Sequence, residues 1–141
     1  QMCIRDRFAG VDWKNREYVS NLVQLVDGHG EMHEYSEEYG GMHDTTLWRL
    51  EHVAYGDVAG DPAPEAIVLI SEQWYAPGGA HSPRGWLFVY TMSAGALEEV
   101  ASTPAAGGTR VEVESRRIRT SSGTKSEGTW IVRGKSLENV P

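Results

Sequence analysis

Residues 50–70 read LEHVAYGDVAGDPAPEAIVLI, and this stretch decides the fold because it joins two apolar runs through a loop that cannot be helical. Pro62 and Pro64 exclude a helix through the loop, since proline lacks a backbone N–H and restricts the residue before it. The chain therefore has to turn between the two runs and return. We predict one strand over Leu47–Val58 and a second over Ala66–Ile70.

The run Ala66–Ile70 is apolar at every position, and so is Trp86–Tyr90. Continuous apolar runs of this length, rich in β-branched and aromatic residues, are typical of strands that are covered on both faces. We predict that these two strands lie together at the centre of one sheet.

Turn signals recur along the rest of the chain, at Asp27-Gly28, Ser93-Ala94-Gly95 and Gly134-Lys135. No amphipathic pattern of helical length stands between them, although Asp44–Glu51 allows one short helical turn. The pattern predicts an all-β single domain of eight or nine strands, arranged as a sandwich or a strongly bent antiparallel meander. The segments expected to be loops are 37–46, 76–85 and 104–108.

The composition is that of one globular domain, with 141 residues, 40% of them apolar and 23% charged. The net charge of −7 disfavours a nucleic acid or an anionic membrane as partner. We expect no membrane span, since no apolar run reaches the length that a bilayer requires.

Residues 2–7, which read MCIRDR, resemble a translated sequencing adapter. We therefore expect residues 1–7 to be a non-native leader and residues 8–141 to form the single β-rich domain. The only cysteine, Cys3, falls in this leader. The expected domain thus has no residue for a disulfide, a catalytic thiolate or a cysteine-ligated zinc ion.

The loop after the first apolar run carries Asp57, Asp61 and Glu65 at its first, fifth and ninth positions. Alternate carboxylates in a loop are typical of calcium sites, which bind through oxygen ligands. Ala59 leaves the third position without a ligand. The competing interpretation, which we favour, is that the aspartates accept backbone N–H bonds within turns.

Three segments carry a resemblance to a protein family. Tyr55–Asp61, followed by Glu65–Val68, resembles the YGDxTGDGxEEAVV segment of uncharacterised exported bacterial proteins, often lipoproteins, and more distantly the FG-GAP repeat of integrin-type propellers. Val11–Asn15 with Tyr18, and Trp86–Tyr90 with the following Ala94–Leu97, are similar to other segments of those exported proteins. The resemblance implies an extracytoplasmic β domain, in the periplasm or at the cell surface, with no assigned reaction.

The stretch from Asp27 to Asp44 holds six acids and three histidines, with no Lys or Arg. His29 and His33 have metal-ligand spacing only on a helix, and neighbouring glycines oppose a helix here. In a strand the two would face the same side, about 13 Å apart. A solvated polar segment is therefore preferred over a zinc or nickel site, and the surrounding carboxylates favour protonated imidazoles.

Trp74 and Tyr75 stand just before a loop rich in proline and glycine, where binding residues tend to lie. We predict this pair as a binding surface for a glycan or a protein. The alternative is that the aromatic residues are core, because indole rings bury much area in a small domain.

No ordered set of Ser, His and Asp emerges, and neither Ser71 nor Ser82 lies in a Gly-x-Ser-x-Gly turn. The leading hypothesis is therefore a non-catalytic extracytoplasmic domain that binds an unknown ligand or has a structural role. Two alternatives remain open: a calcium-stabilised FG-GAP-like binding domain and a hydrolase with an unrecognised site. The basic C-terminal part is expected to pair with the acidic N-terminal half, within one molecule or between two, or to be a solvated face.

Overall fold

The computed structural model describes residues 7–18, 23–36, 42–60, 64–76, 79–80 and 83–141, and the predicted all-β fold is confirmed in them. The strands are β1 (Glu17–Tyr18), β2 (Val23–Gln24), β3 (His29–Ser36), β4 (Met42–Gly56), β5 (Glu65–Ala76), β6 (Gly79–Ala80), β7 (Arg84–Ser93), β8 (Ala96–Ala106), β9 (Arg110–Glu114), β10 (Arg117–Ser122), β11 (Lys125–Arg133) and β12 (Ser136–Val140). Among the described residues, no helix has the length and apolar character that crossing a membrane requires.

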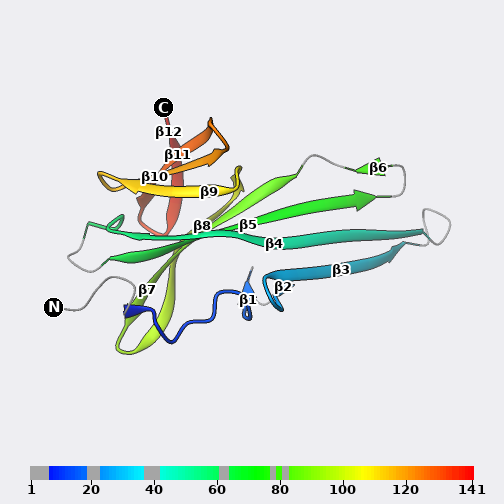
Figure 1. The fold of residues 1–141 in the computed structure, drawn as a ribbon, viewed down its shortest axis with the longest axis horizontal. Coiled ribbons are helices and arrows are strands. Elements are labelled where there is room, and N and C mark those ends of the chain that lie inside the picture. The colour runs from blue at the N-terminus through cyan, green and yellow to red at the C-terminus, as the bar shows by residue number, and fades with distance from the viewer. Residues whose placement is uncertain (1–6, 19–22, 37–41, 61–63, 77–78, 81–82) are drawn as a thin grey trace.

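One strongly curled sheet contains most of the chain, in the order β3-β4-β5-β7-β8-β12-β11-β10-β9, with β6 paired to β5. Neighbouring strands are antiparallel, except that β12 meets β8 in parallel where Ser136 lies opposite Ser102. The C-terminal meander β9–β12 stacks over one half of the long strands, and β3, β4 and β5 extend beyond it (Figure 1). The N-terminal segment, with the small β1–β2 pair, lies on the other side.

The predicted central strands are confirmed, because β5 pairs with β7 from Ala66, opposite Tyr90, to Glu72, opposite Arg84. Side chains alternate between the two faces of a strand, so β5 contributes to two cores at once. Ala66, Val68 and Ile70 belong to one apolar cluster, and Ile67 and Leu69 belong to another on the opposite face. All five are fully buried.

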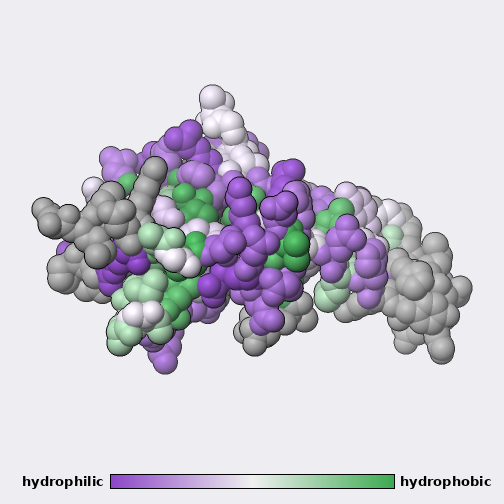
Figure 2. Space-filling model, turned by 60° about the horizontal axis from the view of Figure 1, so that its bottom comes forward, coloured by the Kyte–Doolittle hydropathy of each residue, from purple (hydrophilic) through white to green (hydrophobic). Residues whose placement is uncertain are grey.

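The first core is closed by the N-terminal segment, which lays Phe8, Trp13 and Tyr18 against the sheet. Trp13 donates its indole N–H to the Tyr55 hydroxyl at 3.1 Å, and the Tyr18 hydroxyl donates to the carbonyl of Trp13 at 2.7 Å. Burial raises the pKa of Tyr18. Figure 2 shows the outside of this region, where hydrophilic residues dominate and hydrophobic ones form small separate patches.

The cation of Arg16 lies among the aromatic rings of this segment. Its guanidinium carbon is 5.9 Å from the Trp13 ring centroid, 5.5 Å from that of Tyr18 and 5.3 Å from that of Tyr90. These distances are within the range of cation–π attraction. The contacts fasten the N-terminal segment to β7.

The second core is closed by the meander, whose Val111, Ile118, Trp130 and Leu137 are buried against the sheet. The meander approaches β4 closely at Gly56, where a Cβ atom would lie 2.7 Å from Val113 Cγ1. Only glycine fits at that distance. The N–H of Val111 also donates to His52 Nδ1 at 2.9 Å, so β9 is bonded to β4 as well as packed on it.

The predicted turns are present. Asp27 and Gly28 have φ values of 57° and 82°, and Ala94 and Gly95 have 50° and 80°. Two successive residues with positive φ are typical of the type I′ turns that connect hairpin strands. Gly134, with φ 64°, lies in the turn between β11 and β12.

The predicted loop boundaries were wrong at three places. Within the segment 76–85, β5 ends at Ala76, β6 spans Gly79–Ala80 and β7 begins at Arg84. β4 begins at Met42, within the segment 37–46, and the short helical turn expected over Asp44–Glu51 is part of this strand. The polar residues there form a strand because β4 is paired on both sides, with β3 and with β5. β8 likewise runs to Ala106 by pairing with β7 at Gly85. Residues 37–41 lie outside the described part of the chain.

Candidate ligand-binding cleft

Strand β5 changes character at Ser71. On one face of the strand, Ile67 and Leu69 are covered by the meander, whereas Ser71, Gln73 and Tyr75 continue the same face beyond it. Tyr75 is 42% exposed. Figure 1 shows β5 extending beyond the meander, and the burial of its side chains falls over the same part of the strand, from Ser71 onward.

The register of the three long strands sets this face in cross-strand rows. Residues that lie directly opposite each other share a face, with side chains close enough to interact. The rows across β3, β4 and β5 are His29–Arg49–Ser71, Glu31–Leu47–Gln73 and His33–Thr45–Tyr75. The first two rows and Tyr75 of the third line the floor of the site, which is a polar ladder with the apolar side chain of Leu47 at its middle.

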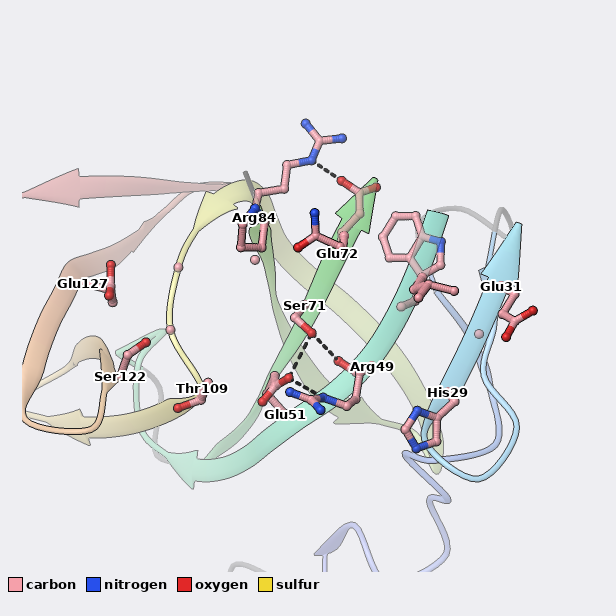
Figure 3. Close-up of a pocket in the computed structure, with 18 of the residues that line it drawn as sticks. His29, Glu31, Arg49, Glu51, Ser71, Glu72, Arg84, Thr109, Ser122 and Glu127 are labelled. Carbon is pink, nitrogen blue, oxygen red and sulfur yellow. Dashed lines mark hydrogen bonds and ion pairs between the residues drawn. The ribbon is translucent and has the colours of Figure 1, made fainter. Parts of the chain in front are cut away.

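The meander supplies the opposite wall. Gly107, Gly108 and Thr109 connect β8 to β9, and Ser122 and Glu127 come from the β10–β11 hairpin. Wall and floor enclose a cleft of about 690 Å³. Figure 3 shows Thr109, Ser122 and Glu127 across the cleft from Ser71 and Glu51.

Gly108 fixes the position of this wall. Its φ is +103°, and a Cβ atom there would lie 2.7 Å from the carbonyl oxygen of Ser121. The next residue, Thr109, donates its N–H to that same oxygen at 2.8 Å. A side chain at position 108 would therefore move the β8–β9 connection away from β10 and change the width of the cleft.

A β-bulge places a carboxylate in the floor. The β4–β5 register shifts between Leu50 and His52, so Glu51 is the extra residue, as in bulges that redirect a side chain. Glu51 Oε1 accepts the Nε–H of Arg49 at 2.7 Å and the hydroxyl of Ser71 at 2.9 Å. The Glu51 side chain is only 8% exposed, whereas that of Arg49 is 60% exposed. The guanidinium is thus held at Nε while the rest of it faces solvent.

A second ion pair stands at one rim. Glu72 and Arg84 are directly opposite on β5 and β7, and the Arg84 Nε–H donates to Glu72 Oε2. The Arg84 guanidinium also lies over the Trp86 ring, 5.6 Å from its centroid. These contacts hold both side chains in place without a ligand.

The predicted metal-ligating residues have other partners. Asp57 Oδ1 accepts the N–H of Gly60 at 3.0 Å, and its Oδ2 is 3.9 Å from Arg116 Nε. Glu65 is fully buried, and its Oε1 accepts the N–H of Val58 at 3.1 Å and of Ala59 at 2.8 Å. Asp61 lies outside the described residues, and the residues that are described contain no group of three or more His, Cys, Asp or Glu that could hold a metal ion.

The predicted aromatic pair is divided between the two faces of β5. Tyr75 lines the cleft, whereas Trp74, 40% exposed, is on the opposite face and opposite Thr46 of β4. The buried Trp48 and the half-buried Trp86 belong to the first core. Trp130 is buried in the second core.

The histidines His29 and His33 share the cleft face of β3, as the strand interpretation requires. His33 Nε2 lies 3.3 Å from Glu31 Oε2, and both side chains are more than half exposed. The side chains of His43, His81 and Ser82 are outside the described part of the structure.

The sequence interpretation missed the cleft residues Leu47, Arg49, Glu51 and Ser71. The sequence of β5 contains a signal for the cleft. Every second residue lies on one face of the strand, and on this face Ile67 and Leu69 are followed by Ser71 and Gln73. That change from apolar to polar on one face marks the end of the covering layer.

Comparison of the chain with known protein families, with curated proteins and with solved structures found no match.

Proposed function

We propose that the protein is a non-catalytic extracytoplasmic binding domain and that its ligand occupies the cleft between the long strands and the meander. The observation that supports this most is the uncovered half of the β4–β5 face, where polar side chains in register line a cleft of about 690 Å³. The size is within the usual range of ligand sites. The extracytoplasmic location is supported by the family resemblance of the sequence.

The side chains of the cleft favour a polar, neutral ligand with hydroxyl or amide groups, as in a glycan or a peptide. Arg49 presents donors from a fixed position, because its Nε is bonded to Glu51. The ring of Tyr75 offers an exposed apolar surface beside Leu47. A side chain that is already held by a hydrogen bond, as Arg49 is, loses little conformational entropy when a ligand binds. Such side chains favour recognition through hydrogen bonds of fixed geometry.

The geometry disfavours catalysis by Ser71. A nucleophilic serine needs a base within hydrogen-bond reach, and histidine is the usual one. His29 is in the same cross-strand row but two strands away, so the two Cα atoms are about 10 Å apart. The Ser71 hydroxyl donates instead to Glu51, a carboxylate that also accepts from Arg49.

The test uses two substitutions in one hairpin. Ser122 lines the cleft, whereas Thr124, an exposed residue of the turn that follows β10, does not. Binding of a library of oligosaccharides and pentapeptides is screened by ligand-observed NMR. We expect Ser122→Trp to abolish the binding of any ligand found, because the indole fills the cleft, and Thr124→Trp to leave it unchanged.

The same ligands are then followed for turnover by mass spectrometry, and none is expected to be cleaved. The proposal fails if Ser122→Trp and Thr124→Trp bind the ligands equally well, or if amide shifts map the ligand to another face. Turnover that is lost in Ser71→Ala would replace the binding function by that of a hydrolase.

A further inference from the structure

Among the residues that the structure describes, the outer edge of β3 presents backbone hydrogen-bonding groups with no β partner. β3 is the terminal strand of the sheet, and the described pairing on its outer side is a single bridge between Val26 and His29. From Glu31 onward, no other strand of the described chain pairs with this edge. At about 3.3 Å per residue, the open edge from Glu31 to Ser36 is about 20 Å long.

The direction of these groups follows from His29. Its N–H donates outward to Val26 O at 3.1 Å, and its carbonyl oxygen accepts the Val26 N–H at 2.8 Å. Because outward and inward groups alternate along an antiparallel strand, the N–H and C=O of Glu31 and His33 also point outward. Those of Met32 point inward, toward β4.

Natural sheets protect such edges with lysine, proline or a short strand. β3 is eight residues long and contains neither lysine nor proline, and its charged residues are the acids Glu31 and Glu34. The stretch from Asp27 to Ser36 contains three acidic residues and no Lys or Arg. The edge is therefore open and acidic, whereas protected edges are often made basic.

Acidic residues lie on both faces of the sheet beside this edge. On the cleft face, the Glu31 side chain is 66% exposed, and its Oε2 lies 3.3 Å from His33 Nε2. On the other face, Asp44 of β4 lies opposite position 34 of β3 in the register. Asp44 Oδ1 is buried and has no hydrogen-bond partner among the described residues.

We propose that the β3 edge binds an extended basic peptide segment of another protein, which adds to the sheet as a further strand. The backbone of the segment pairs with Glu31 and His33, and its lysine or arginine side chains reach Glu31 on one face or Asp44 on the other. The proposal rests on the proposed function, because the added strand forms the outer rim of the same cleft. The net charge of −7 disfavours a second copy of this chain as the occupant.

The first experiment is amide hydrogen exchange with a hexapeptide of alternating lysine and threonine. We expect the peptide to slow the exchange of the Glu31 and His33 amides at least fivefold and to leave the Met32 amide, already bonded inward, unchanged. A hexapeptide with glutamate in place of lysine is the control and is expected to protect neither amide. Equal protection by both peptides overturns the proposal, and so does the absence of protection by the lysine peptide.

The second experiment removes one outward donor. His33→Pro deletes the outward N–H at an edge position that tolerates proline, and His33→Ala keeps it. We expect His33→Pro to weaken binding of the lysine peptide about fivefold, the effect of one lost hydrogen bond, with His33→Ala near wild type. Glu31→Lys is expected to weaken it on the order of tenfold at low salt. Equal affinity in His33→Pro and His33→Ala contradicts strand addition.

Two further outcomes separate the alternatives. If Ser122→Trp abolishes ligand binding in the cleft while the lysine peptide never protects Glu31 or His33, the proposed function stands and the peptide partner is wrong. If sedimentation shows wild-type dimers that His33→Pro converts to monomers, a second copy occupies the edge and the peptide proposal is overturned.

Discussion

At the scale of single residues, Glu65 explains why the loop after β4 is ordered around a carboxylate. A fully buried acid normally needs several hydrogen bonds to offset the loss of its hydration. Glu65 Oε1 accepts two backbone N–H groups, from Val58 and Ala59, at the start of the loop. The acid expected to bind a cation therefore binds the chain itself.

We predict that Glu65→Ala lowers the free energy of unfolding by about 3 kcal/mol, since it leaves two N–H groups without a carboxylate acceptor. Glu65→Gln retains an amide oxygen and is expected to lose about 1 kcal/mol. Urea denaturation measures both. A change below 0.5 kcal/mol (roughly the scatter of surface substitutions) in Glu65→Ala would contradict this role.

His52 predicts a pH dependence of stability. Burial, with Arg110 nearby, lowers the pKa of His52 below its ordinary value of 6.5. Its Nδ1 accepts the N–H of Val111 at 2.9 Å, and a protonated imidazole has no lone pair for that bond. Below pH 6.5 the unfolded chain binds a proton that the folded chain excludes. Stability from this group is therefore complete above pH 6.5 and falls as the pH drops toward the folded pKa.

The measurement is the unfolding free energy of the wild type between pH 7.5 and 5, compared with two variants. His52→Asn keeps a side-chain acceptor but does not titrate, so its curve is expected to be flatter. His33→Gln alters an imidazole that is more than half exposed, with surface contacts to Glu31 and Thr45, and is expected to follow the wild type more closely. Parallel curves for the wild type and His52→Asn would rule out His52 as the cause.

At the scale of elements, the central strands and turns were predictable because their signals are local. The apolar run Ala66–Ile70 predicts a strand that is buried on both faces, and Asp27-Gly28 predicts a turn. The length of β4 was not predictable, because its polar start is a strand only through its pairing with β3 and β5. Pairing is a non-local property that residues 42–46 do not contain.

The contact between β4 and β9 provides a prediction at this scale. A methyl group at Gly56 would lie 2.7 Å from Val113 Cγ1, so Gly56→Ala forces the two strands apart. We expect a loss of about 1–3 kcal/mol in stability, the usual cost of overpacking. Gly10→Ala, where a Cβ meets nothing within 4 Å, is the matched control.

The double variant Gly56→Ala/Val113→Ala separates crowding from an effect of glycine itself. Val113→Ala removes the Cγ1 contact at 2.7 Å but leaves Val113 Cβ 2.9 Å from the new methyl group, so it relieves part of the crowding. The double variant is therefore expected to lose less stability than the sum of the two single variants. Additive losses in thermal or urea unfolding would show that the close approach is not the cause.

At the scale of the whole molecule, the cleft could not be predicted from the sequence. Its floor combines Arg49, Glu51 and Ser71 through the β4–β5 register and a one-residue bulge, and its wall comes from residues more than thirty positions later. Local patterns fix neither the register nor the path of the meander. The sequence contained only the change from Leu69 to Ser71, which marks where the cover ends.

The shared central strand predicts how the molecule unfolds. The N-terminal segment closes one core and the meander closes the other, yet both pack on alternate residues of β5, such as Val68 and Leu69. If either covering layer is lost, β5 is exposed, and the other core also packs on β5. We therefore expect one cooperative transition.

Indole resonances of fluorine-labelled Trp13 and Trp130, one in each core, are expected to disappear at the same urea concentration. Val68→Ala and Leu69→Ala should each lower that midpoint for both resonances, because a cavity on one face removes support from the strand common to both. Separate midpoints for the two indoles would mean that the meander and the N-terminal segment unfold independently of β5.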